Sequence, residues 1–215
     1  MVGITCLLAI VAISFLLGSM PSGLIIGRVF YHTDIREQGS GNIGTTNAIR
    51  AMGKGGGYTV FLMDFAKGVL SGLVGIWLFN LMSTDGGIFT IETCKAVAFL
   101  GCAFGHIFSP WLGFHGGKGI AVSVGCLFVT FGPIGALIEL GLFALLVIAT
   151  KYVSVGSIAA AAICPFIALW LFWGQPLPII LCAIVGVTVI WAHRQNIGRL
   201  VAGNENRIGD KKKEG

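Results

Sequence analysis

Three polar, glycine-rich segments carry the residue types that bind phosphate groups, and long apolar stretches separate them. The first, residues 39–50, reads Gly-Ser-Gly-Asn-Ile-Gly-Thr-Thr-Asn-Ala-Ile-Arg and is here called the cradle loop. Glycines let backbone N–H groups converge on an oxyanion, and hydroxyl and amide side chains add neutral donors. Arg50 adds a planar cationic fork that matches two phosphate oxygens. The predicted phosphate-binding residues of this loop are Ser40, Gly41, Asn42, Thr46, Asn47 and Arg50, and Arg50 is also a candidate catalytic residue.

The cradle loop has a G-x-G-x-x-G spacing at Gly39, Gly41 and Gly44, which also occurs in dinucleotide-binding folds. Such a fold places the glycines after a buried strand in a βαβ unit, whereas a charged stretch precedes them here. Dinucleotide binding is therefore disfavoured. A flexible polar linker has a similar composition, so composition alone leaves a linker and a phosphate site equally open.

The second segment, residues 113–119, reads Gly-Phe-His-Gly-Gly-Lys-Gly and is here called the lysine loop. Lys118 stands directly before a predicted helix, whose first N–H groups and positive dipole end favour a phosphate. We predict that Gly116, Gly117, Lys118 and Gly119 bind phosphate and that Lys118 is catalytic. The spacing differs from that of a P-loop, so nucleotide hydrolysis is not indicated. The alternative is a tight turn with a lysine that snorkels to the membrane surface.

The third segment, residues 191–205, is the polar end of the last apolar run. If that helix continues, His193 and Asn196 share a face at a spacing of three residues. Both are candidate catalytic residues. The alternative is a basic helix end that only sets the orientation of the chain in the membrane.

Several catalytic motifs are absent from the sequence. It has no H-x-x-x-x-D box, no G-x-S-x-G elbow and no H-E-x-x-H motif. Its six cysteines form no C-x-x-C pair, so neither a zinc site nor a redox motif is indicated. We therefore predict chemistry without a covalent intermediate, a metal or a cofactor.

The elements that must position these segments are membrane helices. Of the 215 residues, 55 % are hydrophobic and 11 % are charged, where a soluble domain has about 25 % charged residues. A soluble protein of this size cannot hide so much apolar surface. The composition excludes a soluble globular enzyme, a disordered chain and a nucleic-acid binder with a large basic face. It predicts an all-α, polytopic membrane protein with a single domain over residues 1–215.

The apolar runs predict about seven transmembrane helices, since a crossing needs about 20 mostly apolar residues. Pro21 is expected to break the inner end of the first run, and Gly132-Pro133 divides the long fourth stretch into two helices. A count of five follows if weak segments are joined. The runs cover about 2–27, 57–81, 93–110, 119–150 in two helices, 153–173, and a stretch that ends at Trp191.

The charges predict the orientation. With the N-terminus outside, most lysines and arginines face the cytoplasm, while Asp85 and Glu92 lie outside. This arrangement places the C-terminus in the cytoplasm and needs an odd number of crossings. The three polar segments then meet at the cytoplasmic face of the membrane.

Three ionisable residues fall within the apolar runs. Asp64 and Lys67 are three residues apart on one helix face, and we expect them to form an ion pair. Glu139 is expected to lie near the outer end of its helix and to reach the interface, and no role is assigned to it.

Taken together, these segments resemble the acyl-phosphate:glycerol-3-phosphate acyltransferases, the PlsY family, over nearly the whole chain. The resemblance lies in motifs that occur in order and with suitable spacing. They are Gly18-Ser-Met-Pro-Ser-Gly23, Asp34-Ile-Arg36, the cradle loop, Asp64 with Lys67-Gly68, Gly105-His106, Gly116-Gly-Lys-Gly119, His193-Arg194, Asn196-Ile197 and Arg199-Leu200.

The resemblance implies a multi-pass enzyme of the bacterial cytoplasmic (inner) membrane that needs no cofactor. Its reaction would move a fatty acyl group from acyl phosphate to the 1-hydroxyl of sn-glycerol 3-phosphate, the first acylation step of phospholipid synthesis. The products would be 1-acylglycerol 3-phosphate (lysophosphatidic acid) and phosphate, and the soluble PlsX acyltransferase would supply the donor. Through the resemblance alone, Glu205 is a further substrate contact.

Within that reaction, His193 and Asn196 would position the substrate or share a proton transfer. The general base stays open, and a substrate phosphate oxygen could serve. The competing class is a membrane transporter or channel for phosphate-containing anions. It is disfavoured because the polar groups gather on one face rather than near the midplane of the membrane.

Overall fold

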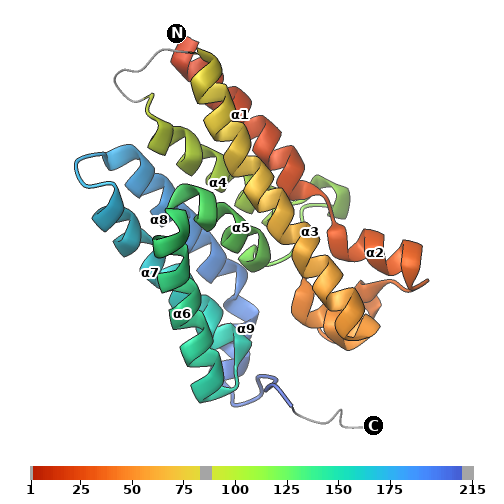
Figure 1. Cartoon of the computed structure of the whole chain (residues 1–215). Helices are drawn as coiled ribbons and strands as arrows, with labels where there is room; N and C mark the ends of the chain where they lie inside the picture. Colours follow the sequence, from red (N-terminus) through yellow and green to blue (C-terminus); the bar gives the residue numbers. More distant parts are fainter. Residues whose placement is uncertain (1, 83–88, 210–215) are drawn as a thin grey trace.

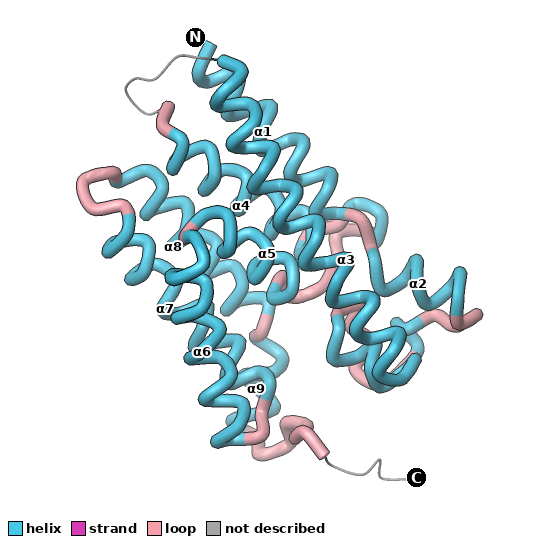
Figure 2. Tube along the Cα trace, viewed as in Figure 1, coloured by secondary structure: helices cyan, strands magenta, loops and turns pink. Residues whose placement is uncertain are grey.

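The computed structural model describes residues 2–82 and 89–209. This part of the chain folds into α-helices joined by short connections and two short 3-10 helices (Figures 1 and 2). The α-helices are α1 Val2–Ser19, α2 Ser22–Phe30, α3 Thr45–Met82, α4 Ile91–Ile107, α5 Ile120–Thr130, α6 Gly132–Thr150, α7 Val153–Leu171, α8 Pro176–Ala192 and α9 Arg194–Val201. The 3-10 helices are η1 Ile35–Glu37 and η2 Pro110–Leu112.

Five helical segments are long and apolar enough to cross a membrane, which confirms a polytopic helical membrane protein. They are Gly3–Phe30, Thr45–Met82, Ile91–Leu112, Gly132–Thr150 and Val153–Leu171, and α8 with α9 makes a sixth if the bent pair is one span. The count of seven crossings is not confirmed. The reason is α5, whose 11 residues extend only about 16 Å, against about 30 Å for the apolar core of a bilayer.

The breaks between helices lie where proline and glycine predict them. The first run is interrupted at Pro21, with α1 ending at Ser19 and α2 beginning at Ser22. The second break lies between α5 and α6, where Gly132, the first residue of α6, has a φ of 71°, a conformation that glycine adopts without strain. A third break was not predicted. Gly53 has a φ of 74° and a ψ of −177° inside α3, so the first two turns of α3 form a separate short helix that carries Arg50.

Helix α4 lies at the centre of the bundle and is the most buried of the spans, in contact with α1, α3, α5 and α8 (Figure 1). Small residues let its neighbours come close. A Cβ at Gly101 would stand 2.7 Å from the carbonyl oxygen of Val11, and one at Gly75 would stand 2.7 Å from that of Cys94. Such close backbone approach is how helices associate in lipid.

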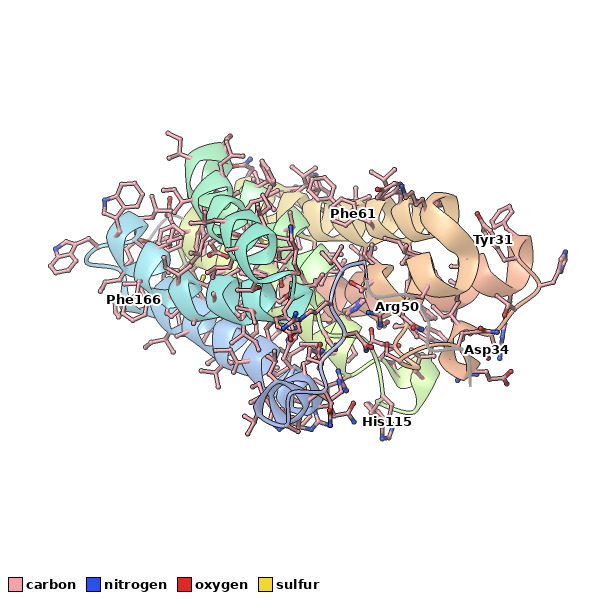
Figure 3. All side chains as sticks on the ribbon, turned by 90° about the horizontal axis from the view of Figure 1, so that it is seen from below. Tyr31, Asp34, Arg50, Phe61, His115 and Phe166 are labelled. Atoms are coloured by element: carbon pink, nitrogen blue, oxygen red, sulfur yellow. The ribbon has the colours of Figure 1, made fainter. Side chains whose placement is uncertain are left out.

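Large apolar side chains cover the outer surface of the bundle. Ile134, Ile148, Phe166 and Val187 are each about two-thirds exposed, and Figure 3 shows Phe166 pointing away from the protein. An apolar surface of this kind is compatible with lipid rather than with water.

A separate hydrophobic core lies at the end of the bundle where α2 and the start of α3 meet. We call it the end core; it consists of Leu24, Ile26, Ile35, Ile43, Ala48, Met52, Val60 and Leu112. Its members come from α2, η1, the cradle loop, α3 and η2. The end core therefore fixes the cradle loop against the rest of the protein.

Candidate functional site

The structure brings the three predicted segments to one end of the bundle (Figures 1 and 3). The side chain of Arg50 lies against Gly39 across the cradle loop. The charges of Arg50, Arg199 and Glu205 all act on Lys118, so the cradle loop, the lysine loop and the segment after His193 share one electrostatic environment.

Asn47 holds the cradle loop in shape. Its Oδ1 accepts a hydrogen bond of 2.8 Å from the backbone N–H of Ser40, and its Nδ2 donates at 2.8 Å to the carbonyls of Ile35 and Asn42. The side chain is 2 % exposed. Both ends of the amide are therefore bonded within the protein, and the structure places Asn47 as a brace of the loop.

The other predicted residues of the cradle loop are more open. Ser40, Gly41, Thr46 and Arg50 are exposed. Asn42 is half-buried, and its Oδ1 accepts a hydrogen bond of 2.9 Å from the backbone N–H of Gly44. The positive φ angles of Gly39 and Gly41, 57° and 69°, allow the tight turn between them. The loop is thus an ordered turn, unlike the flexible linker that composition left open.

The cations of the first polar segment divide into paired and unpaired groups. Arg28 and Arg36 both bind Asp34, with N–O distances of 2.9 Å and 2.7 Å. The hydrogen bond from Arg36 holds the pKa of Asp34 well below its usual range. Burial acts in the opposite direction, and the hydrogen bond from Arg28 lowers the pKa further. Arg50 has neither a hydrogen-bond nor an ion-pair partner in the part of the chain that the structure describes.

The lysine loop folds back onto the end of α4. The backbone N–H groups of Gly116 and Gly117 donate to the carbonyls of Ile107 and His106, both at 3.0 Å. A side chain at either glycine would collide with His106. These two glycines therefore permit a close approach to α4, while Gly119, with a φ of 84°, is the N-cap residue of α5.

Lys118 is half-buried between these glycines. Burial lowers the pKa of its ammonium group to about 8; Arg199 and Arg50 add to this lowering, and Glu205 opposes it. Like Arg50, Lys118 has no hydrogen-bond or ion-pair partner among the described residues. Arg50 and Lys118 are thus two unpaired cations that repel each other, and each lies beside an ordered glycine-rich turn. A bound anion would stabilise such a site.

The chain bends by 52° between α8 and α9, so the last helix does not continue straight as the shared-face prediction required. His193 lies at the bend and is 2 % exposed. Its Nδ1 is 2.8 Å from the carbonyl oxygen of Val189. Because a carbonyl only accepts, Nδ1 carries a proton, and in the neutral ring Nε2 is then the acceptor.

Asn196, Arg199 and Glu205 form one hydrogen-bonded group. Asn196 Nδ2 donates to Glu205 Oε1 at 2.7 Å, and Arg199 Nε donates to Glu205 Oε2 at 2.6 Å. Burial raises the pKa of Glu205, but the hydrogen bonds from Asn196 and Arg199 outweigh it, and the net pKa is lowered. Asn196 Oδ1 is buried and has no partner in the described ranges, so it can accept a hydrogen bond from a ligand.

The predicted ion pair of Asp64 and Lys67 is confirmed, with Lys67 Nζ 2.9 Å from Asp64 Oδ1. Lys67 Nζ also donates at 2.7 Å to the carbonyl of Met20 at the break between α1 and α2. His106 Nδ1 lies 4.0 Å from the same Asp64 oxygen. The position of His106 beside Asp64 was not predicted, because the sequence indicated His106 only through the pair Gly105-His106.

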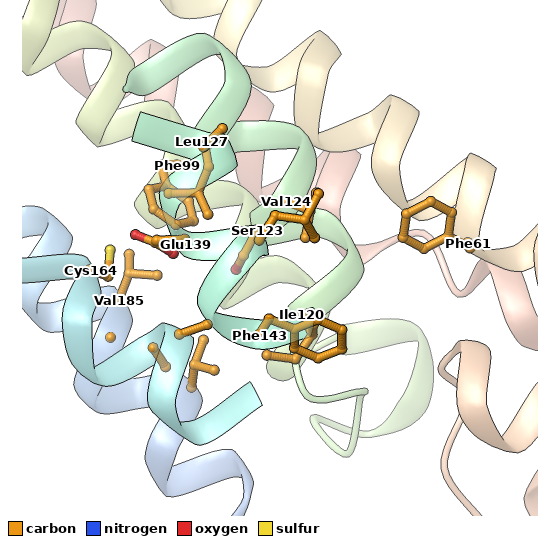
Figure 4. Close-up of a pocket in the computed structure, with 16 residues that line it drawn as sticks. Phe61, Phe99, Ile120, Ser123, Val124, Leu127, Glu139, Phe143, Cys164 and Val185 are labelled. Atoms are coloured by element: carbon orange, nitrogen blue, oxygen red, sulfur yellow. The ribbon is translucent and has the colours of Figure 1, made fainter. Parts of the chain in front are cut away.

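An apolar pocket lies between α5, α6, α7 and α8, and Phe61 of α3 and Phe99 of α4 complete its lining (Figure 4). Ile120, two residues after Lys118, lines it, and so does Val189, whose carbonyl accepts from His193. The space between these helices measures roughly 690 Å³, part of it open to the surroundings. A cationic site and an apolar pocket thus adjoin, which suits a molecule with an anionic head and an apolar tail.

Comparisons with known proteins agree with this geometry. The model of the family "Glycerol-3-phosphate acyltransferase" matches residues 8–203. A glycerol-3-phosphate acyltransferase of Synechococcus sp. (strain JA-3-3Ab) is 43 % identical over 198 residues, which cover 92 % of this chain and 91 % of the relative.

Two crystal structures of PlsY (YgiH), an integral membrane glycerol 3-phosphate acyltransferase, have the same fold. The glycerol 3-phosphate form is 34 % identical to this chain, with a TM-score of 0.81, and the match covers 94 % of this chain and 96 % of the crystallised one. The lysophosphatidic acid form is 33 % identical, with a TM-score of 0.78, and the match covers 94 % of this chain and 95 % of the crystallised one.

The fold and the matches place the chain among integral membrane enzymes of acyl transfer. It belongs to the glycerol-3-phosphate acyltransferase family, and the resemblance to PlsY is confirmed.

Proposed function

We propose that the protein transfers a fatty acyl group from acyl phosphate to the 1-hydroxyl of sn-glycerol 3-phosphate. The products are 1-acylglycerol 3-phosphate and inorganic phosphate, and the reaction is the first acylation of bacterial phospholipid synthesis. The observation that carries this proposal is the pair of unpaired cations, Arg50 and Lys118, close to an apolar pocket whose lining includes Ile120. Both substrates bear a phosphate group, and only the donor bears a long apolar chain.

Acyl phosphate is already activated, so the reaction needs no covalent enzyme intermediate. The 1-hydroxyl oxygen forms a bond to the acyl carbon, and the bond between that carbon and the phosphate oxygen breaks. Arg50, Lys118 and the backbone N–H groups of the cradle loop orient the two anions and stabilise the charge that develops on the departing phosphate.

The proton of the 1-hydroxyl needs an acceptor. His193 Nε2 and a substrate phosphate oxygen are the two candidates, while Glu205 is occupied by Asn196 and Arg199. Asn196 Oδ1 accepts a hydrogen bond from a substrate hydroxyl in this scheme. His193→Gln distinguishes the two candidates, because it keeps a polar group but removes the basic nitrogen.

The orientation and the partners complete the proposal. The N-terminus lies outside and the C-terminus in the cytoplasm of a bacterial cell, so the site faces the cytoplasm at the inner membrane. The soluble PlsX acyltransferase supplies acyl phosphate to that face.

The test uses purified full-length protein in lipid vesicles with acyl phosphate as donor. We expect inorganic phosphate and 1-acylglycerol 3-phosphate to form in equal amounts and only when glycerol 3-phosphate is present. Lys118→Ala should lower the rate at limiting donor by about 10–100-fold, since a charge-assisted contact is lost. Transport of glycerol 3-phosphate across the vesicle membrane without acylation would overturn the proposal in favour of a transporter.

A further inference from the structure

Glu139 is a buried carboxyl group that the reaction above does not use. Its side chain is 4 % exposed, and its Oε1 has no hydrogen-bond partner in the described part of the chain. The expectation that Glu139 reaches the membrane interface is wrong, because the residue faces inward and lines the apolar pocket. An incompletely bonded carboxyl group is costly to bury, and ionisable residues within membrane segments are usually functional.

The surroundings of Glu139 are almost entirely apolar. Figure 4 shows its side chain near Phe99, Cys164 and Val185, all of which line the pocket. The thiol of Cys164 points toward the carbonyl of Cys182 at 3.9 Å. Ser123 of α5, which also lines the pocket, has a second buried oxygen without a partner in the described ranges. The pocket therefore suits apolar atoms, and Glu139 is the ionisable group among its lining residues.

The position of Glu139 along the pocket follows from the helices. The pocket adjoins the phosphate site at Ile120 and Val189. Glu139 lies about 16 Å from the end of α6 at Thr150, and Cys164 lies about 16 Å from the start of α7 at Val153, at 1.5 Å per residue. Both residues therefore stand about halfway through the apolar thickness of a bilayer.

We propose that Glu139 sets the upper limit on the length of the acyl chain that the enzyme accepts. This inference rests on the proposed function and specifies its donor. The occupant of the pocket is the acyl chain of the donor, because two of its lining residues adjoin the phosphate site: Ile120 follows Lys118 by two residues, and the carbonyl of Val189 contacts His193. A chain that reaches Glu139 covers the carboxyl group with methylene groups and offers it no hydrogen bond. A shorter chain leaves the space beside the carboxyl group unfilled, so that a water molecule can enter it and form the missing hydrogen bond.

The test is an internal competition among saturated acyl phosphates from lauroyl to arachidoyl. The full-length protein acts on an equimolar mixture in one vesicle preparation, and mass spectrometry gives the ratio of the lysophosphatidic acids formed. That ratio reports relative kcat/KM and is independent of the amount of active protein. It stays informative even if a variant folds poorly.

Glu139→Leu and Glu139→Gln form the matched pair, since they have similar size and differ in polarity. We expect Glu139→Leu to raise the arachidoyl-to-lauroyl product ratio by about tenfold, because the polar group that disfavours long chains is gone. Glu139→Gln should keep the wild-type ratio. Glu139→Met serves as a second apolar variant, and Leu145→Ala, on the exposed face of α6, should leave the ratio unchanged.

Two outcomes would overturn the inference. One is an unchanged product ratio in both Glu139→Leu and Glu139→Met. The other is an equal rise in the ratio in Glu139→Gln, which would show that shape rather than polarity sets the limit. Failure of the wild-type protein to acylate glycerol 3-phosphate from any donor would instead refute the proposed function.

Discussion

His106 and Gly117 lie in direct contact, and this contact fixes the backbone one residue before Lys118. Gly117 donates its N–H to the carbonyl of His106 at 3.0 Å, and the imidazole fills the space that a side chain at position 117 would occupy. Behind the ring stand Asp64 and Lys67, and Lys67 also binds the carbonyl of Met20. The position of Lys118 thus depends on α3, α4 and the break after α1.

Gly117→Ala should therefore impair catalysis by displacing the lysine loop. A displacement of about 1 Å at a reacting group can cost about 100-fold in rate, and we expect a loss of that order in kcat/KM. Gly141→Ala is the control, because a Cβ at Gly141 meets open space. Near-normal kinetics for Gly117→Ala would show that the loop adjusts without moving Lys118.

The activity should fall as pH rises through the pKa of Lys118. That pKa is lowered to about 8, so the ammonium group is charged at lower pH and loses its charge above this value. We expect kcat/KM for the donor to decline above about pH 8. The decline in kcat should begin at a higher pH than the decline in kcat/KM, because bound phosphate favours the charged form of Lys118.

Lys118→Arg provides the check on this assignment. Guanidinium stays charged throughout the accessible range, so the alkaline decline should disappear or move upward even if the absolute rate drops. The same decline in Lys118→Arg and in the wild-type protein would assign it to another group.

Arg50→Lys should separate the geometry of Arg50 from its charge. If the planar fork holds two phosphate oxygens, lysine cannot replace it, and the variant should be nearly as impaired as Arg50→Ala. Steady-state kinetics with each substrate varied in turn measure the effect. Lys54→Ala, at an exposed cation just after the break at Gly53, should behave as wild type. Normal turnover and Michaelis constants for Arg50→Lys would reduce Arg50 to an electrostatic role.

Asn47→Asp should destabilise the cradle loop although it is nearly isosteric. The carboxylate can still accept from Ser40 but cannot donate to the carbonyls of Ile35 and Asn42. Each lost bond to a buried carbonyl costs about 1–3 kcal/mol. We expect a lower Tm together with lower kcat/KM, while Gln38→Ala, at an exposed position, should change neither. An unchanged Tm with a raised Michaelis constant would instead indicate direct substrate contact.

The orientation can be tested by cysteine labelling of intact cells. All six native cysteines are buried, so the background should be low. A cysteine at Trp173, which is 80 % exposed between α7 and α8, should react with a membrane-impermeant reagent, whereas cysteines at Lys54 and Ile208 should not. Position 86, the outer loop named by the sequence, lies outside the described residues. External labelling at Ile208 would reverse the orientation.

The features that sequence predicted well depend on neighbours along the chain. Hydropathy indicates membrane helices because lipid forces each spanning segment to satisfy its own backbone hydrogen bonds. The breaks at Pro21 and at Gly132-Pro133 follow from local backbone chemistry. The pair of Asp64 and Lys67 follows from helical spacing alone.

The features that sequence missed depend on contacts between distant segments. The sequence does not distinguish an Asn47 that binds a ligand from one that braces its own loop. The hydrogen bonds of Asn47 with Ser40 and Ile35 show that it braces the loop. Glu139 faces inward because of how α6 packs on α7, which no single helix encodes. Gly53, with its positive φ, is one of four glycines within residues 53–57, and nothing in the local sequence distinguishes it from the other three.

The end core determines when the site can form during biogenesis. Its residues span the chain from Leu24 to Leu112, so the cradle loop lacks its support until η2 has left the ribosome. Membrane helices, by contrast, insert independently before they associate. We expect a nascent chain arrested before Pro110 to be membrane-inserted yet cleavable by protease between residues 33 and 44, and protection to appear once Leu112 is present. Synthesis of a competent enzyme therefore includes an assembly step that follows membrane insertion, in which η2 completes the end core and fixes the cradle loop.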